Sequence, residues 1–275
     1  MWIGGETPLS LLQFDGGIIM EIQIDNKTLT NALEDVWMKG KYHNGESAKN
    51  SQLTDYAMLE MIQDNLLNLY NADNQTICRV SVPVIRNIGR DTNNLMVVEI
   101  DKMMKYLKTF TGDSVLLAVT DYITLKDLDG GKTATMPLVV NHPNASMIAR
   151  IQNYTITPEN PVFSRVTFET VITTGSKILT DAIKTCDVIN NAKYKFDTDG
   201  EDFHISSSKS NIDTVDVEVP TLSIVGEPST VEITGQFHKF FRGSVPVVIY
   251  LKDESPVIWS GEDRILVKAP YLARS

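Results

Sequence analysis

Apolar and polar residues alternate in many short runs along the chain, and a few stretches instead place apolar residues at helical spacing. Residues 78–82 and 215–219 alternate in this way, and each run ends at a proline, Pro83 or Pro220. Such alternation is typical of a strand with one buried face. Near residue 180 the apolar residues instead form a helical stripe made of Ile178, Leu179, Ala182, Ile183 and Cys186. The pattern therefore predicts a mixed α+β protein.

The same series of elements occurs twice. Five short matches appear in the same order in both halves of the chain. They equate residues 29–33 with 179–183, Leu67 and Leu69 with Phe203 and Ile205, 78–82 with 215–219, 98–100 with 231–233, and 136–138 with 269–271. Each half is predicted to run strand, helix, three strands, strand, helix, three strands. A tandem repeat of this kind defines the whole fold, so we predict two similar α+β domains.

A connector separates the two halves. Residues 141–162 contain three prolines and show no clear periodicity, which is typical of a linker. We expect an N-terminal extension at residues 1–17, a first domain at 18–140, the connector at 141–162 and a second domain at 163–275. Only the first half contains an additional polar segment, residues 39–54.

Charge and composition narrow the class of protein. The 275 residues are 42% hydrophobic and 22% charged, and no apolar run is long enough to cross a bilayer. The first seventeen residues lack the basic region of a secretory signal and the chain has two cysteines, so we expect a non-secreted protein in a reducing compartment. The net charge of −10 excludes a protein that binds polyanions through bulk positive charge. Contact with nucleic acid therefore requires a segregated basic surface.

Three of the four predicted helices carry basic residues opposite their apolar stripe. The second helix, with Asp101 as its expected N-cap, places lysines three residues apart. On any one helix such lysines are ordinary solvated residues. On three equivalent helices they favour a track that binds phosphates without reading bases. The candidate DNA-facing residues are Lys102, Lys105, Lys108, Lys177, Lys184, His238, Lys239 and Arg242.

The sequence offers no catalytic or metal-binding constellation. Residues 130–133 resemble a phosphate-binding loop, but Lys126 stands where that motif requires a glycine, so a hairpin turn led by Asp129 and Gly130 is the better interpretation. The four histidines and two cysteines do not fall at metal-ligand spacing. Adjacent acidic residues lie mostly at predicted turns, where solvated carboxylates are ordinary. We predict a protein that is not an enzyme and uses no metal or cofactor.

Taken together, the order of elements, the duplication and the proline-containing connector resemble the proliferating cell nuclear antigen (PCNA)-type family of DNA sliding clamps. Residues 255–258 and 268–270 add to the resemblance, which spans residues 18–272. It implies an internally duplicated sliding-clamp fold with two similar α+β domains, each with outer antiparallel sheets and two inner helices. It also implies a homotrimeric ring around duplex DNA, placed there by a clamp loader, that tethers a DNA polymerase and other replication or repair proteins.

The resemblance implies two further sets of residues. Strand 132–138 of one subunit would pair with strand 213–219 of the next, the alternative being two exposed edges protected by turns and charge. The interface candidates are Lys132, Thr133, Ala134, Thr135, Met136, Asp213, Thr214, Val215, Asp216 and Val217. Partner peptides would insert apolar anchors into a groove beneath the connector, and its candidates, equally compatible with ordinary packing, are Met61, Ile62, Tyr154, Ile156, Pro256, Val257, Ala269 and Pro270.

Some features depart from the family pattern. The first helix carries Glu34 and Asp35 where a basic lining would need lysines, and residues 1–17 and 39–54 have no counterpart in the family. The function that we expect is that of a polymerase processivity factor in the cytoplasm or nucleoid, or in the nucleus of a eukaryote. A checkpoint-type or heteromeric clamp-like ring subunit is one alternative. A β-rich assembly or virion protein that does not bind DNA is another.

Overall fold

The computed structural model describes most of the chain. The described residues are 20–37, 55–63, 65–73, 75–87, 95–139, 142–152, 154–189, 192–235, 237, 240–241 and 246–272. The expected extension at 1–17, the polar segment at 39–54 and three candidate DNA-facing residues, His238, Lys239 and Arg242, lie outside the described residues.

The two halves of the chain have the same order of strands, and each begins with a strand that leads into a helix of 11 residues. The first half contains β1 (Met20–Asp25), α1 (Asn26–Val36), β2 (Tyr56–Gln63), β3 (Leu66–Ala72), β4 (Thr76–Pro83), β5 (Arg86–Asn87), β6 (Leu95–Glu99), α2 (Ile100–Leu107), β7 (Ser114–Val119), β8 (Tyr122–Asp127) and β9 (Thr133–Pro137). The second contains β12 (Thr170–Gly175), α4 (Ser176–Cys186), the short 3-10 helix η1 (Asp187–Ile189), β13 (Lys193–Thr198), β14 (Phe203–Ser208), β15 (Thr214–Glu218), β16 (Ser223–Gly226), β17 (Ser229–Thr234), β18 (Pro246–Leu251), β19 (Val257–Ser260) and β20 (Arg264–Lys268). Between them lie α3 (Ala145–Gln152), β10 (Val162–Phe163) and β11 (Val166–Thr167).

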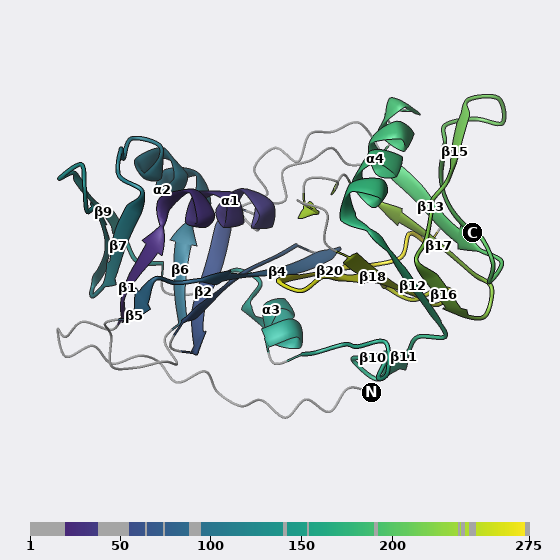
Figure 1. The fold of residues 1–275 in the computed structure, drawn as a ribbon, viewed down its shortest axis with the longest axis horizontal. Coiled ribbons are helices and arrows are strands. Elements are labelled where there is room, and N and C mark those ends of the chain that lie inside the picture. Colours follow the sequence, from purple (N-terminus) through teal and green to yellow (C-terminus); the bar gives the residue numbers. More distant parts are fainter. Residues whose placement is uncertain are drawn as a thin grey trace.

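Strand pairing repeats in the same way in both halves. β1 pairs with β5 and β7, as β12 pairs with β16 and β18, and β2 pairs with β3 and β6, as β13 pairs with β14 and β17. The resulting sheets have the orders β5-β1-β7-β8-β9, β15-β14-β13-β17 and β16-β12-β18-β19-β20-β4-β3-β2-β6. The nine-stranded sheet joins the halves, because β4 of the first pairs with β20 of the second at the middle of the molecule (Figure 1). The predicted duplication is confirmed.

Rows of paired residues show which positions of the two repeats are equivalent. The first pair of rows is Ile22, Leu117, Leu125 and Ala134 against Ile172, Ile249, Trp259 and Leu266. The second pair of rows is Val80, Leu69, Leu59 and Met96 against Val217, Ile205, Phe196 and Val231. α1 and α4 are both 11 residues long and occupy equivalent places.

Two of the five sequence matches are displaced from these equivalences. The match of 98–100 with 231–233 is wrong by two residues, because Val231 takes the place of Met96 and not of Val98. A shift of two keeps the same face of a strand buried, so the apolar pattern alone does not reveal it. The closing match is wrong by one residue, since Ala134 corresponds to Leu266 and not to Val267.

Three local expectations are also corrected. The connector was expected to lack regular structure, yet α3 forms there because Ile148 and Ile151, three residues apart, are both buried. The N-cap of α2 is Glu99 instead of Asp101, which lies in the first helical turn where a carboxylate is favoured by the helix dipole. In α4 the buried stripe leaves out Ile178, which is 41% exposed.

The apolar core lies on both faces of the central sheet. One cluster fills the space between the sheets and α1, α2 and α4, and includes Leu29, Leu107 and Trp259. A second cluster lies on the opposite face beneath α3 and includes Ile148 and Tyr250. α1, α2 and α4 therefore cover one side of the molecule and α3 covers the other (Figure 1).

Candidate DNA-facing helices and partner groove

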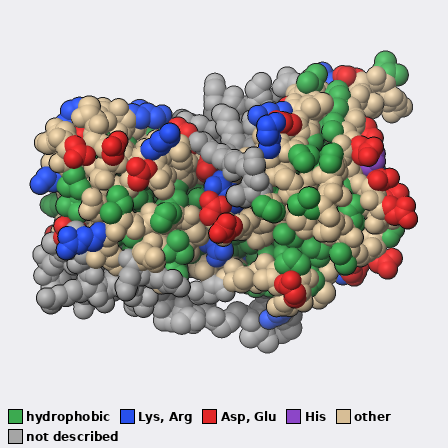
Figure 2. Space-filling model, in the orientation of Figure 1, with side chains coloured by type: hydrophobic (Ala, Val, Ile, Leu, Met, Phe, Trp, Pro, Cys, Tyr) green, Lys and Arg blue, Asp and Glu red, His purple; other side chains and the backbone are tan. Residues whose placement is uncertain are grey.

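The basic residues of the helices point away from the core. α2 buries Met103, Met104 and Leu107, while Lys105 and Lys108 are exposed and Lys102 is half-buried. In α4, Lys177 and Lys184 are exposed opposite the buried stripe. In Figure 2, lysine and arginine side chains lie along the edge that holds α1 and α2 and again beside α4. The structure thus brings five of the predicted residues to one side of the molecule.

Several of these lysines are paired with acidic neighbours. Lys105 lies 2.5 Å from Asp101, and Lys177 lies 2.8 Å from Asp181, each one helical turn away. The hydrogen bond to the aspartate raises the pKa of both lysines. Exposed pairs at this spacing contribute little to stability, so a phosphate can displace the carboxylate at low cost.

The acidic residues of α1 are occupied by other contacts. Asp35 is 7% exposed, and its carboxylate accepts a hydrogen bond of 3.2 Å from Nη1 of Arg264 in β20. Glu34 pairs with Lys108 of α2 at 3.6 Å. Arg264 also donates to the carbonyl of Phe240, so it links the second half of the chain to the first helix. Asp35 is therefore a structural residue of the junction and adds little negative charge to the helix surface.

The predicted interface residues lie on two open sheet edges. β9 is the last strand of the five-stranded sheet, β15 is the last strand of the four-stranded sheet, and the two lie at opposite ends of the molecule (Figure 1). Within the described part of the chain no strand pairs with their outer sides. Ala134, Val215 and Val217 project toward the helix-side core and are only partly buried. Each edge thus carries an incompletely covered apolar row.

A buried carboxylate holds the turn that precedes β9. Asp127 accepts hydrogen bonds from the backbone N–H groups of Thr111, Gly112, Asp129 and Gly130 at 2.9–3.3 Å. Burial alone would raise the pKa of Asp127, but the four donors together lower it below the usual range. A Cβ at Gly112 or Gly130 would lie 2.3 or 2.1 Å from this carboxylate, so both positions require glycine. The predicted turn at residues 129–130 is present in this form.

An apolar groove lies on the connector side of the central sheet. Its volume is about 130 Å³. The groove is bounded by β4, β20, α3 and the β10–β11 hairpin. Its lining consists of Gln75, Ile77, Met147, Arg150, Phe163, Ser164, Val166, Phe168, Pro256, Val267 and Ala269. Two predicted groove residues, Pro256 and Ala269, are among them.

The other predicted groove residues lie elsewhere. Met61 and Val257 are 1% and 0% exposed and belong to the core on the opposite, helix-facing side of the sheet. Tyr154 packs edge-on against Phe163, with ring centroids 4.5 Å apart, and Ile156 is buried in the same cluster, so both support the wall from behind. Ile62 and Pro270 are not part of the lining.

The missed lining residues had a weak sequence signal. Met147 and Arg150 lie one turn apart on α3, the helix that the connector prolines concealed. The alternation of Ile77 and Val267 with their neighbours predicts strands but not which face holds a groove.

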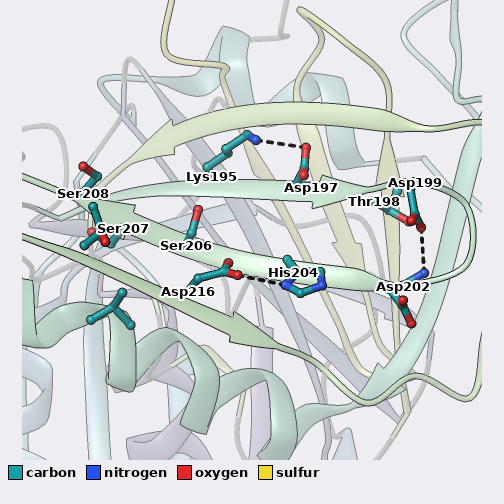
Figure 3. Close-up of a pocket in the computed structure, with 12 residues that line it drawn as sticks. Lys195, Asp197, Thr198, Asp199, Asp202, His204, Ser206, Ser207, Ser208 and Asp216 are labelled. Atoms are coloured by element: carbon teal, nitrogen blue, oxygen red, sulfur yellow. Dashed lines mark hydrogen bonds and ion pairs between the residues drawn. The ribbon is translucent and has the colours of Figure 1, made fainter. Parts of the chain in front are cut away.

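A shallow polar hollow of about 520 Å³ lies on the outer face of β13, β14 and β15. Figure 3 shows two of its side-chain contacts: Lys195 lies 3.2 Å from Asp197, and Nδ1 of His204 lies 3.1 Å from Asp216. Among the described residues no group of three His, Cys, Asp or Glu side chains could hold a metal ion. Nor is any helix in those parts of the chain long and apolar enough to span a bilayer.

Comparison with known proteins identifies the fold. No family model matches the sequence, and no curated protein matches it. The structure resembles A. fulgidus PCNA, solved with the C-terminal region of FEN-1 bound, with a TM-score of 0.66 at 17% identity over 94% of this chain and 100% of that one. It resembles the DNA polymerase sliding clamp of Bacillus subtilis with a TM-score of 0.70 at 15% identity over 98% of this chain and 68% of that one. It also resembles the PCNA2–PCNA3 complex of Sulfolobus tokodaii with a TM-score of 0.65 at 16% identity over 91% of this chain and 99% of that one.

These likenesses establish the architecture. The chain has the sliding-clamp fold, and the predicted fold class, an internally duplicated α+β sliding-clamp fold, is confirmed.

Proposed function

We propose that this chain is a DNA sliding clamp, a non-catalytic processivity factor that forms a ring around duplex DNA and tethers replication or repair enzymes. The observation that carries the proposal is the pair of open edges, β9 and β15, whose counterparts in the other repeat already pair within the chain.

The internal junction supplies a template for the subunit interface. β20 and β4 pair antiparallel, with Leu266 opposite Cys78. Ala134 of β9 is the counterpart of Leu266, and Val215 of β15 is the counterpart of Cys78. Pairing β9 of one subunit with β15 of the next in the same register would therefore place Ala134 opposite Val215. This arrangement joins the two partly buried apolar rows and leaves neither edge unpaired.

Such contacts are head-to-tail, and a head-to-tail contact closes into a ring when its rotation permits. We propose a homotrimer, in which every subunit contributes one β9 edge and one β15 edge. The helices would then face the hole, because they cover one side of the sheets in both halves (Figure 1).

The helix lysines would contact the DNA backbone. Lys102, Lys105, Lys108, Lys177 and Lys184 occupy the helix side, whereas the protein as a whole has a net charge of −10. Phosphate contacts of this kind are independent of sequence and weaken with salt, which permits sliding. The track would be uneven around the ring, since α1 contributes Asp35 to the junction in place of a lysine.

The connector-side groove would bind peptide segments of partner enzymes. A. fulgidus PCNA was solved with the C-terminal region of FEN-1 bound, so a protein of this fold binds a segment of another protein. We propose a DNA polymerase and other replication or repair proteins as partners, and an ATP-driven clamp loader to place the ring on DNA.

Solution mass together with retention on circular DNA tests the proposal. A homotrimer has three times the 30.7 kDa of one chain, and it should stay on nicked circular duplex after loading and leave when the circle is linearised. A stable monomer that forms a ring only with unlike chains would favour a heteromeric subunit, and the PCNA2–PCNA3 complex shows that this fold occurs in such complexes. A very large assembly that ignores DNA would favour a β-rich assembly protein.

A further inference from the structure

The groove between α3 and β20 is apolar inside and positive at its rim. Met147, Phe163 and Phe168 contribute to its walls, and among the described residues that line it none is acidic. Arg150 is exposed at the rim, one helical turn after Met147. No ion pair within the described part of the chain involves Arg150. Arg150 therefore places a positive charge beside an apolar groove on a protein with a net charge of −10.

The opposite rim is a strained hairpin. Phe163 pairs with Val166, which leaves a two-residue turn formed by Ser164 and Arg165. Both have positive φ, 48° and 73°, in the left-handed region that favours asparagine and glycine in such turns. The hydroxyl of Tyr154 accepts a hydrogen bond of 3.0 Å from the backbone N–H of Ser164 and so holds the turn. Backbone strain of this kind is concentrated at ligand clamps, and Arg165 adds a second exposed positive charge there.

The wall that carries Arg150 is fixed to the central sheet. Nη1 of Arg79 in β4 donates to the carbonyls of Ile151 and Tyr154, both at 3.4 Å. Nδ2 of Asn144, just before α3, donates to the carbonyl of Ala72 at 2.6 Å. The groove is therefore preformed, and a ligand loses little free energy in ordering it.

We infer that Arg150 makes this groove selective for partner segments in which an aspartate or glutamate directly adjoins a large apolar residue. The inference rests on the proposed function and names the chemistry of the partner. A volume of about 130 Å³ accommodates about one large apolar side chain, which anchors the segment. The guanidinium then binds the neighbouring carboxylate, a geometry in which arginine forms two parallel hydrogen bonds. Because the pair is exposed, its contribution is about twofold to fivefold in affinity.

Fluorescence anisotropy with labelled octapeptides tests this selectivity. Each peptide carries one leucine, phenylalanine or tryptophan anchor in a glycine–serine background, followed by glutamate, glutamine or lysine. The parent should bind the glutamate peptides about twofold to fivefold more tightly than the glutamine peptides, and the lysine peptides most weakly. Arg150→Glu should reverse the order. Lys209→Glu, which makes the same charge change on an exposed loop far along the sequence, should leave it unchanged.

A groove-filling variant separates the possible failures. Ala269 is exposed in the lining, and its backbone N–H bonds to Gln75, so Ala269→Trp fills the groove without removing a core contact. Binding that is lost in Ala269→Trp but equal for glutamate and glutamine peptides would overturn the role of Arg150 and leave the groove as a partner site. Equal effects of Arg150→Glu and Lys209→Glu, or no peptide binding by the parent, would also overturn it. If the protein failed to form a ring or to stay on circular DNA, the proposed function would be wrong, whereas the preference of the groove for acidic peptides would be unaffected.

Discussion

Lys268 is a buried cation at the junction between the repeats. It is 4% exposed, its Nζ donates to Oγ1 of Thr76 at 3.0 Å, and it lies 5.5 Å from the ring centroid of Phe237. Its counterpart in the first repeat is Met136, two residues after Ala134, so the fold accepts methionine at this position. We therefore predict that Lys268→Met stabilises the protein at neutral pH.

The magnitude follows from the protonation equilibrium. Burial lowers the pKa of Lys268 from 10.5 to about 8, with a smaller opposing effect from Asp73. That shift corresponds to about 3 kcal/mol of unfolding free energy, because each pKa unit is worth about 1.4 kcal/mol. Between pH 8 and 10.5 the unfolded chain binds a proton that the folded chain does not, so the stability of the parent rises with pH across this window. The variant also loses the hydrogen bond to Thr76 and the contact with Phe237, which offsets roughly 1–2 kcal/mol of this stabilisation. The net gain in the free energy of unfolding is therefore about 1–2 kcal/mol at pH 7.

Urea unfolding of parent and variant from pH 7 to 10.5 measures this effect. The gain from Lys268→Met should shrink steadily above pH 8, because the parent loses its buried charge there. Lys209→Met, at an exposed position, should match the parent at every pH. A stability difference that does not change with pH, or a destabilised Lys268→Met at pH 7, would refute the reasoning.

Three further predictions concern the edges and the junction. Val215→Asp should give monomers instead of a ring in sedimentation experiments while leaving the circular dichroism spectrum unchanged. Ile212, in the same hairpin, is 96% exposed, so Ile212→Asp should leave the ring intact. Dissociation of the ring by both variants would show that the β15 edge is not the specific contact. Asp127→Ala should lower the melting temperature at pH 7. Because the pKa of Asp127 is lowered in the folded protein, the difference in melting temperature between parent and variant should disappear only as the pH falls through the acid range. An unchanged melting temperature at pH 7 would contradict this. Arg264→Ala should lower the unfolding free energy by about 3–5 kcal/mol because it removes the cation from the buried ion pair with Asp35. A loss below about 1 kcal/mol would show that the pair is dispensable.

Much of the fold could be predicted because strand alternation and the repeat survive in the sequence. The apolar stripe of α4 and the alternation of β4 and β15 placed these elements correctly, and β9 and β15 lie at the open edges where the resemblance put them. Matching of short segments gave a wrong alignment where a shift of two residues leaves the alternation of apolar and polar residues unchanged. The match of residues 98–100 with 231–233 is such a case.

The candidate sites were harder to predict because they depend on which face of an element is covered. Met61 and Val257 are large apolar residues near the predicted groove, yet their side chains lie on the other face of the sheet, in the helix-side core. The wall of the groove comes from α3, whose two buried isoleucines were masked by the prolines around them. Likewise, the acidic appearance of α1 gave no hint that Asp35 is paired with Arg264, 229 residues away.

Cross-linking of the predicted interface tests the central claim most directly. In the proposed register Ala134 lies opposite Val215, and paired positions on antiparallel strands bring Cα atoms to about 4.5–5.5 Å, within reach of a disulfide. The native cysteines, Cys78 and Cys186, are both buried and should not compete. Oxidised Ala134→Cys/Val215→Cys should run under denaturing conditions as a closed species of three chains, while Ala134→Cys/Val217→Cys, displaced by two residues, should stay largely monomeric. Absence of the cross-linked trimer, or equal cross-linking by both variants, would contradict the head-to-tail ring.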